Sequence, residues 1–255
     1  MARRKRSDPK LPAPYLLRVW LDQDDIPEPD AYPFVLPFLK RGFELAFDSR
    51  ITVIVGENGV GKSTVIEGIA SLCGFDGAGG GNGYRPVDHS NAVETGGELL
   101  GEVLRAAWRP KITNGWFFRA ESFFSVARYL DEAAIASGNA PPDFLSYSHG
   151  EGFMRFFEER CGQPGIFFFD EPESALSPAR QVEFLKLLRA MHDSEKCQVI
   201  MATHSPILMA LPEASLLHMS KYGLEPVTLE DTDHFRLWRE FCISPLSFVE
   251  GLLAE

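Results

Sequence analysis

One stretch of eight residues, GENGVGKS at 56–63, has the residue types and the spacing of a phosphate-binding loop. Its three glycines allow backbone N–H groups to turn toward phosphate oxygens, where a Cβ atom would obstruct the approach. An apolar run at 51–55, ITVIV, precedes the loop, and a helix is predicted from Thr64 to Cys73. The N-terminus of that helix would add partial positive charge. The stretch therefore predicts a site for a nucleoside triphosphate and not an incidental glycine-rich turn.

The residues at the end of this loop have separate predicted roles. Lys62 would contact the β- and γ-phosphates, Ser63 would be a ligand of Mg²⁺, and Thr64 would donate a hydrogen bond to a phosphate. The predicted nucleotide-binding residues of the loop and the helix start are Gly56, Glu57, Asn58, Gly59, Val60, Gly61, Lys62, Ser63 and Thr64.

Two further segments end in residues that could serve the same site. IFFFDEPE at 166–173 is an apolar run followed by carboxylates, of which Asp170 would hold Mg²⁺ and Glu171 would polarise an attacking water. MATHSPIL at 201–208 would deliver His204 to contact the γ-phosphate and orient that water. The alternatives are a solvated acidic loop and a structural histidine. The phosphate loop upstream favours the catalytic interpretation of both segments.

The elements that must position these residues are short, continuously apolar runs at 51–55, 166–169 and 198–202, each followed by a helical pattern. Such runs are typical of strands covered on both faces, as in a parallel sheet. Strand followed by helix, repeated, predicts a wound α/β sheet. Residues 94–160 have helical spacing and predict an inserted helical subdomain. Glycine-rich residues 74–83 predict a loop, and the C-terminal part predicts two strands and a helix.

Composition indicates an ordinary globular protein, with 45% hydrophobic and 24% charged residues. No apolar run reaches the roughly 18 residues needed to cross a bilayer, so no integral membrane segment is expected. Four widely separated cysteines favour reduced thiols and a cytoplasmic location.

The net charge of −11 argues against a surface that coats nucleic acid. The basic start (residues 1–14) predicts a flexible tail, which could either contact phosphates or only aid solubility.

Taken together, GENGVGKST, the DEP segment and THSPIL resemble the ABC-type ATPase superfamily, and in detail its soluble branch, which includes the RecF, SMC and OLD-like proteins. The resemblance covers residues 15–250. It implies a P-loop NTPase fold of the ABC type, a mostly parallel core sheet with an added antiparallel β region, in a single domain over 15–255. It also implies that ATP and Mg²⁺ are bound. Ser148 lies only 86 residues after Lys62, which leaves too little chain for the long coiled-coil arms of SMC-type proteins.

The same resemblance implies that ATP binds between two head-to-tail copies, with a signature loop of one copy facing the phosphates held by the other. The sequence SHGE is the candidate for that loop: Ser148 matches the signature serine, Gly150 the second glycine and Glu151 the final polar position. Ser148 lies 22 residues before Asp170, about the family's spacing. His149 departs from the pattern. Ser-x-x-Glu is also a capping box, which can start a helix with or without the signature role.

Two other positions depart from the family's pattern. Where a glutamine is usual, GWFFRAES at 115–122 offers Arg119 or Glu121, so a water or metal contact there stays open. After the DEP segment, SALSP places Ser177 as an N-cap with proline at the first helical position.

The function expected from these features is a Mg²⁺-dependent ATPase that dimerises on ATP and drives a conformational change in a protein, DNA or RNA complex. Glu171, His204 and Lys62 would be its catalytic residues, and Ser63 and Asp170 its metal ligands. The alternatives are the ATP-binding subunit of an ABC transporter and a non-hydrolysing nucleotide switch in a defence or toxin-like system.

Overall fold

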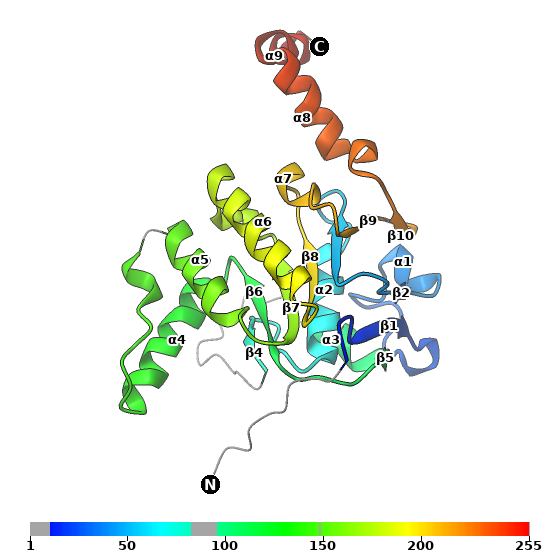
Figure 1. The fold of residues 1–255 in the computed structure, drawn as a ribbon. Coiled ribbons are helices and arrows are strands. Elements are labelled where there is room, and N and C mark those ends of the chain that lie inside the picture. The colour runs from blue at the N-terminus through cyan, green and yellow to red at the C-terminus, as the bar shows by residue number, and fades with distance from the viewer. Residues whose placement is uncertain (1–10, 83–95, 148, 255) are drawn as a thin grey trace.

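The chain folds around two β-sheets in the computed structural model, which describes residues 11–82, 96–147 and 149–254 (Figure 1). The seven-stranded sheet contains, in spatial order, β10 (Gly223–Pro226), β9 (Ser215–Ser220), β3 (Ile51–Val55), β8 (Cys197–Ala202), β7 (Gly165–Asp170), β6 (Gly115–Arg119) and β4 (Gly80–Gly81). The three-stranded sheet contains β2 (Glu44–Ala46), β1 (Leu16–Leu21) and β5 (Leu104–Trp108). This arrangement confirms the expected α/β class.

The centre of the large sheet is parallel. Strands β9, β3, β8, β7 and β6 run in one direction, and only β10 and β4 pair antiparallel at the two edges. Every residue of β3, β7 and β8 is buried, as their continuously apolar sequences predict. Because parallel strands end at one edge, the segments that follow β3, β7 and β8 lie side by side. Those segments are the phosphate loop, the DEP residues and the THSP residues.

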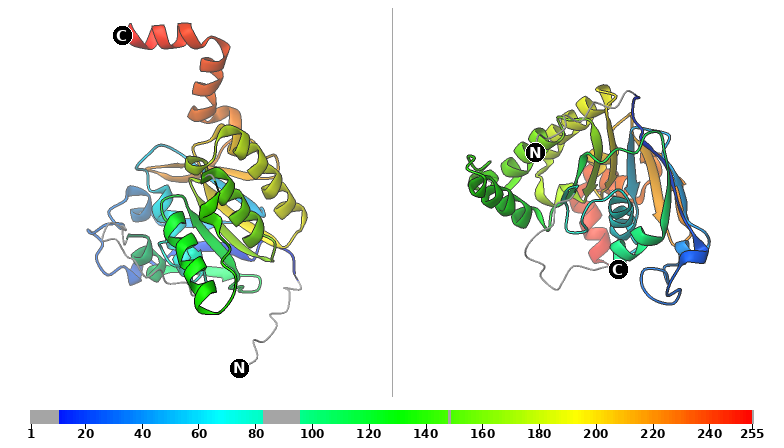
Figure 2. Two further views of the ribbon diagram at one scale, coloured as in Figure 1. Left: turned by 90° about the vertical axis from the view of Figure 1, so that its left-hand side faces the viewer. Right: turned by 90° about the horizontal axis from the view of Figure 1, so that it is seen from below.

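Alternate side chains of the core strands face two different layers. Phe168 and Ile200 pack with α2 (Lys62–Leu72), α3 (Gly96–Val103) and the three-stranded sheet. Phe167 and Phe169, one residue away, pack with α4 (Phe123–Ala136), α5 (His149–Arg160) and α6 (Pro178–Asp193) on the other face (Figure 2). This period of two places apolar side chains in both layers, so the sheet edge that carries the loops is held rigidly from both sides.

The expected helical range of 94–160 is only partly helical. It contains α3, α4 and α5, but β5 and β6 lie between them, and each belongs to a different sheet. The loop expected at 74–83 likewise contains the two-residue strand β4. Periodicity does not reveal these strands, because β5 is half-buried along most of its length and β4 is two glycines. The pairing of each with a distant strand, and not its own pattern, makes it a strand.

The C-terminal part extends away from the body as a helical arm. Strands β9 and β10 and the helix after them form as predicted. Two short helices lie elsewhere in the chain, α1 (Pro37–Lys40) and α7 (Pro206–Met209). Helices α8 (Asp233–Ile243) and α9 (Pro245–Leu253) project from the sheet edge near α7 (Figures 1 and 2). No residue of α8 or α9 is buried. Over the described ranges, no helix has the length and apolar character required to cross a bilayer.

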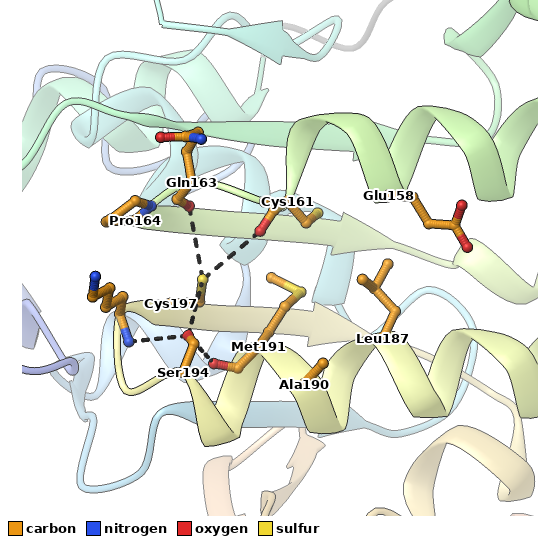
Figure 3. Close-up of a pocket in the computed structure, with 11 residues that line it drawn as sticks. Glu158, Cys161, Gln163, Pro164, Leu187, Ala190, Met191, Ser194 and Cys197 are labelled. Carbon is orange, nitrogen blue, oxygen red and sulfur yellow. Dashed lines mark hydrogen bonds between the residues drawn. The ribbon is translucent and has the colours of Figure 1, made fainter.

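At the amino ends of β7 and β8 lies a cavity of about 400 Å³, lined in part by Cys161, Met191 and Cys197 (Figure 3). Burial raises the pKa of both thiols, so they are neutral at physiological pH and poorly nucleophilic. The Cys197 thiol lies 3.7 Å from the hydroxyl oxygen of Ser194. These cysteines are therefore packing groups at the sheet edge opposite the phosphate loop.

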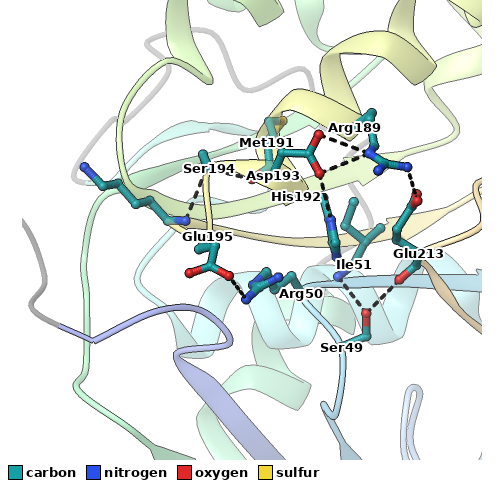
Figure 4. Close-up of polar contacts among 11 residues, drawn as sticks. Ser49, Arg50, Ile51, Arg189, Met191, His192, Asp193, Ser194, Glu195 and Glu213 are labelled. Atoms are coloured by element: carbon teal, nitrogen blue, oxygen red, sulfur yellow. Dashed lines mark hydrogen bonds and ion pairs between the residues drawn. The ribbon is translucent and has the colours of Figure 1, made fainter.

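The same edge carries a set of surface ion pairs (Figure 4). Arg50 pairs with Glu195 at 2.7 Å, and Arg189, near the end of α6, pairs with both Asp193 and Glu213. The pairs of Arg189 with Asp193 and of Arg50 with Glu195 have strongly exposed acidic partners, so each contributes little to stability. The Arg50–Glu195 pair joins the residue before β3 to the segment just after α6, and the Arg189–Asp193 pair lies within α6; neither takes part in the site described below.

Gly115, the first residue of β6, should not tolerate a side chain. Its φ is 143°, and an added Cβ would lie 1.7 Å from the backbone oxygen of Ile166 on β7. We expect Gly115→Ala to lower the free energy of unfolding by at least about 2 kcal/mol, measured by urea denaturation. Gly138→Ala is the control, because Gly138 also has a positive φ, of 75°, but open space around it. A Gly115→Ala midpoint equal to that of the control would contradict the packing argument.

Candidate functional site

The phosphate loop passes directly against the backbone of β9. Gly56 has a φ of 148°, and a Cβ there would lie 2.4 Å from the backbone oxygen of Met219. Gly59 and Gly61 also have positive φ, of 78° and 102°. Helix α2 begins at Lys62, immediately after the loop. The loop therefore takes a conformation that needs glycine, at a helix N-terminus suited to anions.

The Lys62 ammonium lies inside its own loop. Its Nζ donates to the backbone oxygens of Gly56 at 2.9 Å and Glu57 at 3.0 Å, and the residue is buried. Burial lowers the pKa of Lys62, while the carboxylates of Glu171 and Asp170 act in the opposite direction. A cation placed this way, desolvated within a glycine-rich loop at a helix N-terminus, suits a phosphate chain as its counter-charge.

Ser63 and Asp170 meet beside the loop. The Ser63 hydroxyl donates to Oδ1 of Asp170 at 3.1 Å, across 107 residues of sequence. Burial raises the pKa of Asp170 to about 6, although Arg119 and the Ser63 hydroxyl both favour the ionised form. A hydroxyl and a carboxylate are hard oxygen ligands of the kind Mg²⁺ binds, and the cation would itself favour the ionised carboxylate. The donor set therefore fits the predicted metal.

A cavity of about 170 Å³ opens next to this pair and is lined by Ser63, Arg119, Ala120, Glu121, Asp170, Glu171 and Ser174. That volume has room for several waters. In the part of the chain that the structure describes, no group of three or more His, Cys, Asp or Glu side chains is placed to hold a metal. Mg²⁺ at Ser63 and Asp170 would therefore take most of its ligands from phosphate oxygens and water, as is usual for this ion.

Glu171 faces the same cavity from a strained backbone position. Its φ of 47° and ψ of 54° are left-handed, and its N–H donates to the backbone oxygen of Ala202 at 3.0 Å. Its Oε1 lies 3.4 Å from Nε2 of His204, a close contact without an aligned hydrogen bond. Interaction with His204 lowers the pKa of Glu171, so its carboxylate is ionised at neutral pH and able to accept a proton.

Arg119 is one of the two residues predicted to stand near the position where the family usually has glutamine. It is paired in register with Asp170, and its Nε lies 3.8 Å from Oδ2 of that residue. Its Nη1 lies 2.8 Å from Glu67 and donates to the backbone oxygen of Gly77. Glu121, the other candidate, is 87% exposed and contacts Arg119 at 3.5 Å. Arg119 therefore supplies fixed positive charge beside Asp170, and Glu121 lies at the rim.

The predicted signature segment is only partly visible. Ser148 lies outside the described residues, as does the side chain of His149. Helix α5 starts at His149, which both the signature and the capping interpretation predict. Gly150 lies against the backbone oxygen of Ala175, and Glu151 pairs with Arg180 at 3.1 Å. These contacts hold the start of α5 against the segment that follows Glu171.

The N-cap predicted after the DEP segment is present. The Ser177 hydroxyl accepts from the backbone N–H of Arg180 at 3.4 Å, and Pro178 is the first residue of α6. The structure therefore assigns Ser177 a local role at the helix start.

Three residues at the site were not predicted from the sequence. The Tyr32 hydroxyl lies 2.5 Å from that of Thr64, the Glu173 carboxylate accepts from the backbone N–H of His204, and the His234 ring contacts the His204 ring. Glu173 stands within the DEPE segment, so its closeness to the paired acids is a signal that could have identified it. Tyr32 and His234 come from segments without a motif, so only the fold brings them to the site.

Two family models match the segments that carry the phosphate loop and the DEP and THSP residues. A model described as "AAA domain" matches residues 35–103, which include the phosphate loop. A model described as "AAA domain, putative AbiEii toxin, Type IV TA system" matches residues 152–210, which include Asp170, Glu171 and His204. Over 117 residues, the chain is 39% identical to an OLD nuclease of Thermus scotoductus. These partial matches support a stand-alone ATPase of the AAA and ABC type, akin to the OLD-like proteins.

The chain is also 27% identical, over 225 residues, to a protein of Brucella abortus named "Putative ATP-binding protein". The similarity covers 80% of this chain and 62% of that relative, whereas the OLD nuclease match covers 45% of this chain and 22% of the nuclease. The chain thus spans less than two thirds of either relative. A solved structure titled as an inward-facing conformation of a putative metal-chelate type ABC transporter has a TM-score of 0.47 and 18% identity, covering 88% of each chain.

Proposed function

We propose that this ABC-type domain binds ATP with Mg²⁺ and hydrolyses it. The observation that carries the proposal is the meeting of Ser63, Asp170 and Glu171 around one small cavity beside the phosphate loop. These residues come from two different strand ends and supply a metal-binding oxygen pair and an ionised carboxylate within one site. That combination matches the needs of phosphoryl transfer to water.

Each residue has a role that follows from its position. Lys62 and the loop N–H groups would bind the β- and γ-phosphates, and Mg²⁺ held by Ser63 and Asp170 would neutralise charge on those oxygens. Glu171, kept ionised, accepts a proton from a water in the adjacent cavity and so orients it toward the γ-phosphate. His204 lies against Glu171 and can donate to the γ-phosphate. Arg119 holds Asp170 in place from the neighbouring strand.

The proposal extends to an ATP-dependent homodimer. In the superfamily that the chain resembles, ATP binds between two copies, and the signature helix of one meets the phosphates of the other. The start of α5, with Gly150 and Glu151, is the segment of this chain that would make that contact. Closing and opening of the dimer would then drive a change in a bound protein, DNA or RNA complex. The free cysteines at 73, 161, 197 and 242 support a cytoplasmic location.

The metal requirement provides the test. We expect phosphate release from ATP in the presence of Mg²⁺ and its loss when Mg²⁺ is chelated. In Asp170→Asn, the Mg²⁺ concentration that gives half-maximal phosphate release should rise at least tenfold. The reason is that the amide lacks the negative charge that binds the ion. The measurement is a titration of phosphate release against Mg²⁺ at saturating ATP. Asp233→Asn, at the exposed start of α8, is the matched control and should keep the wild-type midpoint. An unchanged midpoint in Asp170→Asn would contradict the assigned metal site.

A second candidate is a nucleotide switch that binds ATP without turnover. The description of the model that matches residues 152–210 names a toxin and a toxin–antitoxin system, which is the setting expected for this candidate. The same titration separates the two functions. ATP binding with phosphate release no faster than that of Glu171→Gln would support the switch and reject the ATPase.

A further inference from the structure

The ring of His204 is contacted on both of its nitrogens. Its Nε2 lies 3.4 Å from Oε1 of Glu171, and its Nδ1 lies 2.8 Å from Nε2 of His234. The two imidazole centroids are 4.9 Å apart and the rings are inclined by 53°. The carboxylate, the first imidazole and the second imidazole therefore form one chain of contacts that leads away from the cavity.

A contact of 2.8 Å between two ring nitrogens requires that one donates and the other accepts. Two protonated imidazoles at that distance would repel each other. Burial, followed by the charge of His204, lowers the pKa of His234, so this ring is neutral at physiological pH. The hydrogen bond fixes the rotation of the His204 ring about its side-chain bond and keeps Nε2 directed toward Glu171. A partner on the far nitrogen is the usual means by which a protein orients a functional histidine.

His234 is held firmly where it meets His204. It is the second residue of α8, whose N-cap Thr232 is buried, accepts from the N–H of Phe235 and donates to the backbone oxygen of Leu229. Beyond this first turn, most of α8 and α9 is exposed. The arm leaves the body at this point (Figure 1). A change at His204 can therefore reach the base of the arm through the contact between His204 and His234.

We propose that His234 is a positioning residue for His204 and that the same contact couples the α8–α9 arm to the state of the nucleotide site. The kinetic part rests on the proposed ATPase function. By reciprocity, a partner that moved the arm would change the nucleotide site, and bound nucleotide would change the base of the arm. A purely structural alternative is that His234 only packs α8 against the body.

The first experiment measures steady-state ATP hydrolysis in three variants. His234→Ala should lower kcat about tenfold, the equivalent of one hydrogen bond, with KM for ATP within about twofold. His234→Gln should recover kcat to within about threefold of wild type, because its amide nitrogen can reach the place of Nε2. Arg239→Ala, exposed on the same helix, should be unchanged. Equal kcat losses in the alanine and glutamine variants, or no loss in either, would overturn the positioning role.

The second experiment does not need turnover. Amide hydrogen exchange of α8 is compared with and without ATP and Mg²⁺ in the Glu171→Gln chain, alone and combined with His234→Ala. We expect ATP to change exchange in the first turn of α8 by at least twofold, and that change to disappear when His234 is alanine. ATP binding without any change at α8, or the same change in both chains, would reject the coupling. If wild type binds ATP but does not hydrolyse it, the ATPase proposal fails while this result still decides the coupling.

Discussion

Glu171→Gln is expected to lower kcat for ATP hydrolysis by about 10²–10⁴-fold, the range that a positioned general base contributes. The carboxylate is ionised because interaction with His204 lowers its pKa, and glutamine of the same shape cannot accept the proton. Affinity for ATP should stay within about threefold, since Lys62 and the loop N–H groups are untouched. Phosphate release and the binding of a fluorescent ATP analogue are the two measurements.

The matched control is Glu121→Gln, which removes a carboxylate at the rim of the same cavity that is 87% exposed. It should retain at least half of the wild-type kcat. Because Glu171→Gln would hold ATP without turnover, it should also accumulate the proposed dimer on size exclusion in the presence of ATP and Mg²⁺. Normal turnover in Glu171→Gln would contradict a role for this residue in catalysis. A Glu171→Gln chain that binds ATP but stays monomeric would contradict the proposed ATP-dependent dimer.

Lys62→Ala should weaken ATP binding by about 10–100-fold, which is the size of a lost charge-assisted hydrogen bond of roughly 1.5–3 kcal/mol. The ammonium is desolvated inside the loop, with two backbone oxygens as its partners, and is placed to exchange them for phosphate oxygens. Titration with the fluorescent analogue measures the change. Unaltered affinity would contradict the phosphate-loop assignment.

Folding must be separated from binding in that variant. Burial lowers the pKa of Lys62, which means that the folded state does not favour its charge, so its removal should leave the thermal midpoint within a few degrees of wild type. Lys40→Ala supplies the comparison, because Lys40 is an exposed lysine at the end of α1 whose contact with Asp30 is long, at 3.9 Å. It should change neither binding nor the midpoint.

Much of the core could be predicted because its residues are constrained locally. Continuously apolar strands at 51–55, 166–169 and 198–202 can be buried only between two layers, so a parallel sheet follows from their composition. The phosphate loop is equally local, since its glycines, lysine and serine are contiguous. By contrast, β5 and β6 lie in a range with helical spacing and become strands by pairing with β1 and β7. A strand that forms by pairing with a distant segment is difficult to predict from its own residues.

By itself, the sequence determined that β3, β7 and β8 would each end in polar residues with the chemistry of a nucleotide site, because strand, loop and residue type are adjacent along the chain. Only the tertiary structure decided which distant groups complete that site. Sheet register places Arg119 beside Asp170, and the return of the chain after β10 brings His234 to His204, 30 residues away. Neither contact can be recognised from the sequence around either residue, because each depends on how two separate elements pack at the same edge of the sheet.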